Sequence, residues 1–455
     1  MSRSKESAAS CPENPRYSPQ ALAEKAYLKE LNQKPVGQRF LGYVKLSGPG
    51  FMSAAFTLGA GSFASSVTLG AAYGYDMLWI PLYSFAFGIF MLALAARFVS
   101  KSEINVIAAQ DKYHGRFFGS FATGLVACFI ASIVYTFGQY ALGADAVTSL
   151  FKVLNVNVPK SVSWIFLVAI SVPLSLMYGS GENPKAVKFV ENAMKVMIGI
   201  MLLVFGAVLC VTGINLPAMV RGLLVPKLPS GLDGIIMLIG SLTATIGVMD
   251  WVLFNNGMIS RGYSEEHETL GRFDAFFGGL LPVTIILSFV SIAFAEAFAG
   301  QEGIPTTSEE LSQALVGIIP SVWIQVGFYV GIIALVVSSM IGLSVTCATS
   351  FYQSVPVPRD TKAWYHPVVV LAPQIGFLGA FFGKPVMIVV TVAAMQSIFN
   401  WISGNSWYLL GNDKRYLGKH VIQSRFFNLG ILICISILNI VFVTFIMSKL
   451  GVWPS

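Results

Sequence analysis

The sequence predicts an all-α integral membrane protein built from two related halves. Of its 455 residues, 55% are hydrophobic and 11% are charged, and the mean hydropathy of +0.70 lies far above that of water-soluble domains. Apolar runs of about 20 residues recur along the chain, long enough for helices to cross about 30 Å of hydrocarbon. The alternating ten-residue pattern of a membrane β-barrel is absent, so the spans are expected to be helical.

Eleven spans are predicted, at about 48–75, 77–99, 117–150, 162–180, 190–214, 232–260, 274–299, 318–352, 365–384, 386–411 and 424–449. The third and eighth are long enough to be tilted or to project beyond the bilayer. Residues 1–46 are polar and contain no apolar stretch typical of a cleavable signal peptide, so we expect a retained tail. Within this tail, residues 19–32 are expected either to form a short helix on the membrane surface or to remain solvated.

Lysine and arginine residues are distributed unequally between the two sides. With a cytoplasmic amino terminus, 23 of the 29 basic residues lie inside and 6 lie outside. This split predicts a cytoplasmic amino terminus and an extracytoplasmic carboxyl terminus in a multi-pass protein, which we expect in the bacterial inner membrane. It also accounts for most of the net charge of +7, so the lipid bilayer rather than nucleic acid is the expected partner. The oligomeric state stays open.

Two spans are interrupted at similar depths. Span 1 is expected to break around Gly59 to Ser62, and span 6 within Gly247-Val248-Met249-Asp250-Trp251. Matched breaks five spans apart are typical of an inverted five-helix repeat, whose unwound helices bind a solute near the bilayer midplane. The alternative is that these glycines only allow close helix packing. The predicted parts are a cytoplasmic tail (1–46), a first repeat (47–214), an extracytoplasmic connection (215–231), a second repeat (232–411), and a cytoplasmic turn with an eleventh helix (412–455).

Asp250 is the strongest candidate for a binding residue. Apart from the terminal turns, it is the only charged residue deep inside any predicted span, where a charge is costly unless it faces a cavity or a partner. Its neighbour Met249 adds a thioether, which favours softer transition metals, although methionine is also a common core residue.

Several weaker ligands accompany this carboxylate. Ser62 offers a hydroxyl, and the breaks are expected to free backbone carbonyls at Leu58, Gly59 and Ile246. Gln396 and Asn400 in span 10 are candidate cavity or coupling residues, or amides that only join helices.

Enzymatic and channel functions are not expected. The four histidines fall in connections or at span ends, and no metalloprotease, serine-hydrolase or phosphate-loop motif is present. A single deep carboxylate does not form the rings of charge that are typical of a selective pore. No bound cofactor is expected either.

Four short motifs resemble those of one transporter family. They are Gly48-Pro49-Gly50-Phe51, Gly70-Ala71-Ala72-Tyr73-Gly74-Tyr75, Leu94-Ala95-Ala96-Arg97 and Asn412-Asp413-Lys414-Arg415. Their order and spacing are similar to those of the NRAMP family of proton-coupled divalent metal-ion transporters, over about residues 40 to 425. The resemblance implies a LeuT-type fold of five plus five inverted helices with one extra helix.

The residues at the implied metal site depart from the family pattern. In the family, span 1 carries Asp-Pro-Gly-Asn, whose Asp and Asn bind the metal, and span 6 carries Met-Pro-His, whose Met is a ligand. The matching residues here are Gly59-Ala60-Gly61-Ser62 and Met249-Asp250-Trp251. Because the family's proton-linked His is Trp251 here, proton coupling through that residue cannot be carried over, and Asp250 itself would have to take up the proton.

These observations leave three hypotheses. In the first, Asp250 replaces the missing carboxylate and the chain transports a divalent cation such as Mn²⁺ or Fe²⁺. In the second, an altered site accepts a small organic cation, with Trp251 as an aromatic wall and Asp250 as the counter-charge; Trp251 as simple packing is the alternative. The third hypothesis, a membrane sensor that does not transport, is disfavoured because nothing resembling an output domain follows span 11.

Overall fold

The computed structural model describes residues 19–102, 104–180, 184–229, 231–245, 247–299, 305–318, 320–422 and 424–450. Within these residues the chain forms helices and no strands, as predicted. Six continuous helices among them are long and apolar enough to cross a membrane: Trp79–Lys101, Phe117–Val153, Glu265–Ala297, Val322–Ser354, Pro385–Asn412 and Arg425–Met447. The remaining predicted spans correspond to interrupted helices or to helices whose apolar stretch is shorter, so the number of membrane crossings stays a prediction.

In the first half, span 1 consists of two helices, α3 (Pro49–Thr57) and α4 (Ala60–Tyr73). The later spans are α5 (Trp79–Lys101), the π-helical segment Phe117–Ile130 continued by α7 (Ala131–Val153), α8 (Lys160–Ser180) and α9 (Pro184–Thr212). The third span is 37 residues long, in agreement with its predicted length.

In the second half, span 6 is again divided, into α11 (Gly231–Thr245) and α12 (Val248–Ser260). The later helices are α13 (Glu268–Phe273), a π-helical segment (Asp274–Leu280) with α14 (Leu281–Ala297), α16 (Val322–Ser354), α17 (Tyr365–Leu371) with a 3-10 segment (Ala372–Phe381), α18 (Pro385–Asn412) and α20 (Arg425–Lys449).

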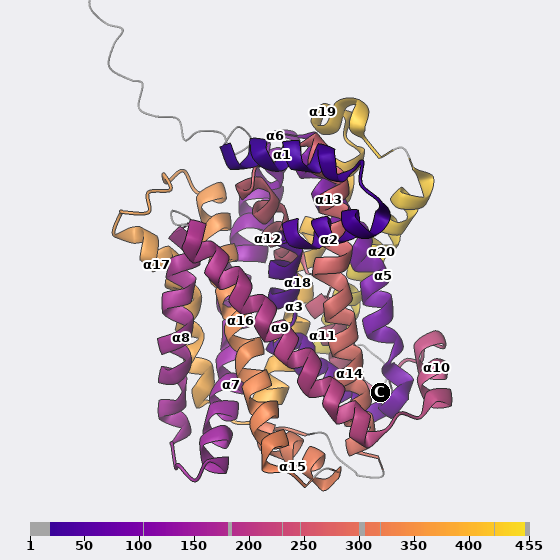
Figure 1. Ribbon diagram of the computed structural model, residues 1–455, viewed down its shortest axis with the longest axis vertical. Helices are drawn as coiled ribbons and strands as arrows, with labels where there is room; N and C mark the ends of the chain where they lie inside the picture. Colours follow the sequence, from indigo (N-terminus) through magenta and orange to yellow (C-terminus); the bar gives the residue numbers. More distant parts are fainter. Residues whose placement is uncertain are drawn as a thin grey trace, which may run out of the picture.

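The short connecting helices gather at the two ends of the bundle. One end carries α1 (Pro19–Leu31), α6 (Val106–Tyr113) and α19 (Lys414–Leu417), near α2 (Val36–Leu46); the other carries α10 (Leu216–Leu224) and α15 (Ser308–Ile318) (Figure 1). Connections predicted to share a side of the membrane therefore share an end of the molecule. In α1, Leu28 and Leu31 are buried, so this helix docks on the protein and is not a solvated tail.

The two interrupted spans cross in the middle of the bundle. Helix α3 packs against α12, while α4 packs against α11, so the two breaks lie opposite each other. Three continuous helices, α7, α16 and α18, also pack against α4. In each broken span a glycine comes directly before the second half-helix. Gly59 precedes α4 and Gly247 precedes α12, and both are in extended conformations. This architecture directs the ends of four half-helices toward one buried region.

Candidate functional site

The break in span 1 is shorter than predicted and begins one residue earlier. Helix α3 ends at Thr57 and α4 starts at Ala60, so only Leu58 and Gly59 are non-helical. Ser62, predicted to lie within the break, belongs to the first turn of α4. Its hydroxyl donates hydrogen bonds to the carbonyl oxygens of Thr57 (2.5 Å) and Gly59 (3.1 Å). The Ser62 hydroxyl therefore satisfies carbonyl groups at the break in the helix.

The break in span 6 places the predicted ligands in the first turn of a helix. Because α12 begins at Val248, the residues Met249, Asp250 and Trp251 are helical, and within the predicted segment only Gly247 is not. Ile246, whose backbone carbonyl is a predicted ligand, lies outside the described residues.

Asp250 lies between two half-helices. Its side chain is buried, and Oδ1 accepts a hydrogen bond from Ser53 Oγ of α3 at 2.5 Å. The side chain of Thr57, at the end of α3, also lies near this carboxylate. No described lysine, arginine or histidine forms an ion pair with this carboxylate. The acid thus faces α3, the half-helix that precedes the break in span 1.

The thioether of Met249 points to the start of α7. The residue is fully buried, and its Sδ lies 3.6 Å from Ser132 Oγ, which also donates to the carbonyl oxygen of Cys128 at 2.6 Å. Trp251 is directed elsewhere, since its ring packs 5.5 Å from the ring of Trp407 on α18. This contact makes Trp251 part of the packing between α12 and α18.

Two buried carboxamides approach the starts of the second half-helices. Gln139 Oε1 accepts a hydrogen bond from the backbone N–H of Ala60 at 3.1 Å, and Asn400 Oδ1 accepts one from the N–H of Val248 at 3.2 Å. Nearby on α18, Gln396 is buried and its Oε1 has no hydrogen-bond partner among the described residues. The site therefore combines one carboxylate, one thioether, hydroxyls and amides.

Sequence reasoning missed the contributions of α3 and α7. Ser53 donates a hydrogen bond to Asp250, while Ser132 and Gln139 contact the two breaks from one face of α7, two helical turns apart. Hydroxyl and amide side chains are common in membrane helices, and their spacing on α7 was the only available signal. Among the described residues, no group of three His, Cys, Asp or Glu side chains could hold a metal ion.

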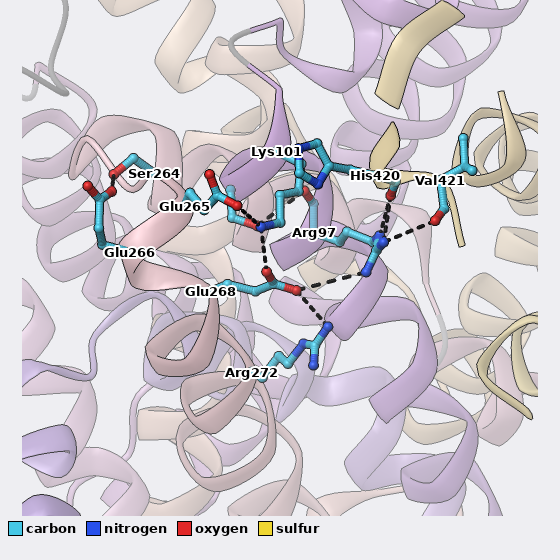
Figure 2. Close-up of polar contacts among 10 residues, drawn as sticks. Arg97, Lys101, Ser264, Glu265, Glu266, Glu268, Arg272, His420 and Val421 are labelled. Atoms are coloured by element: carbon cyan, nitrogen blue, oxygen red, sulfur yellow. Dashed lines mark hydrogen bonds and ion pairs between the residues drawn. The ribbon is translucent and has the colours of Figure 1, made fainter. Parts of the chain in front are cut away.

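Two of the four family-like motifs make contacts at the end of the bundle where α3 begins and α5 ends. Asp274 Oδ2 accepts the backbone N–H groups of Gly48 (3.3 Å) and Gly50 (2.7 Å), and so caps the start of α3. Arg97 Nη2 and Nε donate to the carbonyl oxygen of His420 at 2.6 and 2.8 Å. Glu268 lies 3.0 Å from Lys101 and 2.6 Å from Arg272 in the same cluster (Figure 2).

Known proteins share both sequence and fold with this chain. The curated relatives include the divalent metal cation transporter MntH of Yersinia pestis, 26% identical over 287 residues, which are 60% of this chain and 64% of that protein. The MntH of Pectobacterium carotovorum is 26% identical over 259 residues, covering 55% and 57%. The chain thus spans just under two thirds of the length of the curated relatives it matches.

Two solved structures have similar folds. A mutant of the manganese transporter of Eremococcus coleocola matches with a TM-score of 0.71 and 16% identity, over 93% of this chain and 91% of that one. Mhp1, a nucleobase-cation-symport-1 family transporter, matches with a TM-score of 0.57 and 16% identity, over 89% and 91%. These neighbours confirm the predicted LeuT-type fold.

A family model described as Natural resistance-associated macrophage protein-like (Nramp) matches residues 50–448. That range contains both broken spans and the helices around them. The chain belongs to the Nramp family, whose members are membrane transporters and not enzymes.

Proposed function

We propose that this protein is a secondary active transporter that moves a divalent metal cation across the membrane by alternating access. Its family and its relatives, which are named as divalent metal cation transporters, support the metal as substrate. The observation that carries the proposal is the pairing of Asp250 and Met249 in the first turn of α12, opposite the broken span 1. A carboxylate with a thioether suits Mn²⁺ or Fe²⁺ better than Ca²⁺ or Mg²⁺.

The proposed ligands come from both breaks. Asp250 and Met249 supply side chains, and Leu58 and Ile246 supply backbone carbonyl oxygens. The carbonyl of Gly59, also a predicted ligand, already accepts hydrogen bonds from Ser62 Oγ and the N–H of Phe63, each at 3.1 Å. Ser62 adds one hydroxyl oxygen, which retains lone pairs although its proton is donated within the break. Gln396 and Asn400 of α18 are the proposed cavity residues beside these groups, while Trp251 packs against Trp407 of the same helix.

Coupling and orientation complete the proposal. Since tryptophan stands where the family carries histidine, Asp250 is the group that would carry a coupled proton. Residues 47–214 and 232–411 act as the two inverted repeats that move against each other. The amino terminus is cytoplasmic and the carboxyl terminus extracytoplasmic, in keeping with the excess of basic residues at one end.

Removal of the charge at Asp250 tests the proposal. Asp250→Asn keeps the size and the hydrogen bond from Ser53 but removes the negative charge between the two broken spans, so Mn²⁺ uptake into proteoliposomes should be lost. Asp360→Asn, in an exposed connection, is the matched control and should transport normally. A folded Asp250→Asn protein with wild-type uptake would exclude Asp250 from the site.

A small organic cation is the second candidate substrate. One observation weakens the metal relative to it: the family's metal-binding aspartate is Gly59 here, and Ser339 and Gln139 fill the space that an aspartate side chain would need. Thermal stabilisation of the purified protein should be compared for Mn²⁺, Fe²⁺, Mg²⁺ and a panel of small amines. Selective stabilisation by an amine would reverse the order of the two candidates.

A further inference from the structure

The two half-helices that start at the breaks share an unusual beginning. The residues before them, Gly59 and Gly247, have no side chain, so neither can cap the N–H groups that follow. In an apolar bundle without water, an uncapped backbone N–H costs several kcal/mol. Some other part of the protein has to satisfy them.

Carboxamide side chains from two continuous helices accept hydrogen bonds from these N–H groups. Gln139 of α7 accepts the N–H of Ala60, and Asn400 of α18 accepts the N–H of Val248. Both side chains are fully buried. Because these bonds assign the carboxamide oxygens, Gln139 Nε2 and Asn400 Nδ2 remain without a partner among the described residues.

In span 1 the side chains replace a specific helical hydrogen bond. In a continuous helix the N–H of Ala60 would donate to the carbonyl of Phe56, four residues earlier. Here Gln139 takes the donor, and Ser339 Oγ of α16 donates to that carbonyl at 3.2 Å. Ser338 Oγ likewise donates to the carbonyl of Ala55 at 3.0 Å. Both partners of the missing bond are thus satisfied from neighbouring helices.

We propose that Gln139 and Asn400 are positioning residues that keep spans 1 and 6 broken and so hold the break carbonyls toward the substrate. A neutral carboxamide suits this role because it accepts the N–H without adding charge beside Asp250. The consequence for substrate affinity rests on the proposed function. The inference that these two side chains cap the half-helices does not depend on the proposed function.

The test removes first the acceptor and then the donor. Gln139→Ala leaves the N–H of Ala60 unsatisfied, so hydrogen exchange of the amides of residues 61–63 should rise about tenfold, as for a lost helix cap. The KM for Mn²⁺ uptake should rise by about the same factor while kcat changes little.

Proline at position 60 should reverse this effect. Proline is well tolerated as the first residue of a helix, and the preceding Gly59 is already extended (ψ 179°), as proline requires. In Gln139→Ala with Ala60→Pro no N–H remains to be satisfied, so exchange and KM should return to within about threefold of wild type. The same pair of changes applies to Asn400→Ala and Val248→Pro, because Gly247 is also extended.

Controls separate capping from general damage. Asn405 joins α18 to Asn439 of α20 at 2.8 Å, so Asn405→Ala removes another carboxamide bond between helices and should change neither readout. Gln139→Glu keeps an acceptor oxygen and should show wild-type exchange. This variant tests the capping role even if Gln139→Ala does not fold.

Two results would overturn the inference. One is unchanged exchange in Gln139→Ala. The other is a raised KM that Ala60→Pro fails to reverse, which would indicate that Gln139 contacts the substrate directly. Absence of Mn²⁺ uptake by the wild type would refute the proposed function, while the exchange measurements would still decide whether the two carboxamides cap the breaks.

Discussion

Gly59 lies in the break of span 1, and neighbouring side chains occupy the space beside it. A Cβ at this position would be 2.6 Å from Ser339 Oγ and 2.9 Å from Gln139 Nε2. The family's aspartate therefore has no room here unless both neighbours move. The absence of this ligand thus goes together with two neutral side chains in the space that it would need.

We expect Gly59→Ala to lower the free energy of unfolding by about 1–3 kcal/mol, because the new methyl group overpacks this contact. Thermal unfolding of the detergent-purified protein measures the change. Gly331→Ala is the control, since this buried glycine of α16 has no heavy atom within 4 Å of its Cβ position. That variant should be as stable as wild type or more so. Equal losses in both variants would rule out the contact at Gly59 as the cause.

At the residue scale, the sequence predicted the chemical type of the candidate site residue but not the direction in which its side chain points. The position of a lone carboxylate in an apolar span identified Asp250, because a charge at that depth is costly unless it faces a cavity or a partner. Nothing in the sequence indicated that it would turn toward Ser53 on α3, because that contact joins residues 197 positions apart. The contact of Gln139 with Ala60 was not predicted for the same reason, because these residues are far apart in the sequence.

At the scale of elements, the breaks were predictable because glycine and polar residues interrupt otherwise apolar runs. The π-helical starts of the third and seventh spans were not, since both have the sequence of ordinary apolar helices. Helix α1 had two predicted environments, and its docking is decided by packing of Leu28 and Leu31 that periodicity alone does not reveal.

At the end of the bundle that carries α1 and α6, a histidine joins two elements. His114, which follows α6, forms a 2.9 Å hydrogen bond between Nδ1 and Ser406 Oγ of α18, and its Nε2 lies 3.9 Å from Asp413. Burial lowers the pKa of His114, opposed by Asp413 and assisted by Arg415. The folded protein therefore binds this proton less readily than the unfolded chain.

His114 should make stability depend on pH. With a folded pKa below the ordinary value of about 6.5, the unfolded state binds more protons as the pH falls, so stability present above pH 6.5 is lost below it. The melting temperature of wild type should thus decrease more between pH 7.5 and 5.5 than that of His114→Gln, which can keep the bond to Ser406. Parallel curves for the two proteins would contradict this role.

At the scale of the whole molecule, the charged cluster in Figure 2 joins segments that are distant in the sequence. Arg97 and Lys101 come from α5, Glu268 and Arg272 from α13, and His420 from the chain after α18. Glu268 is the carboxylate that all three cations approach, Arg97 at 3.9 Å. Both halves of the chain are therefore connected at this end, which must loosen if it opens during transport.

Neutralising Glu268 should weaken this connection in a salt-dependent way. Glu268→Gln leaves Arg97, Lys101 and Arg272 with less compensating charge, so the free energy of unfolding should fall by about 1–2 kcal/mol at low ionic strength. The loss should shrink in 1 M salt, because the screening length is then only about 3 Å. Glu30→Gln, which removes an exposed i,i+4 partner of Lys34, should change stability by less than about 0.5 kcal/mol. A loss for Glu268→Gln that persists unchanged in 1 M salt would show that packing, and not charge, holds this end together.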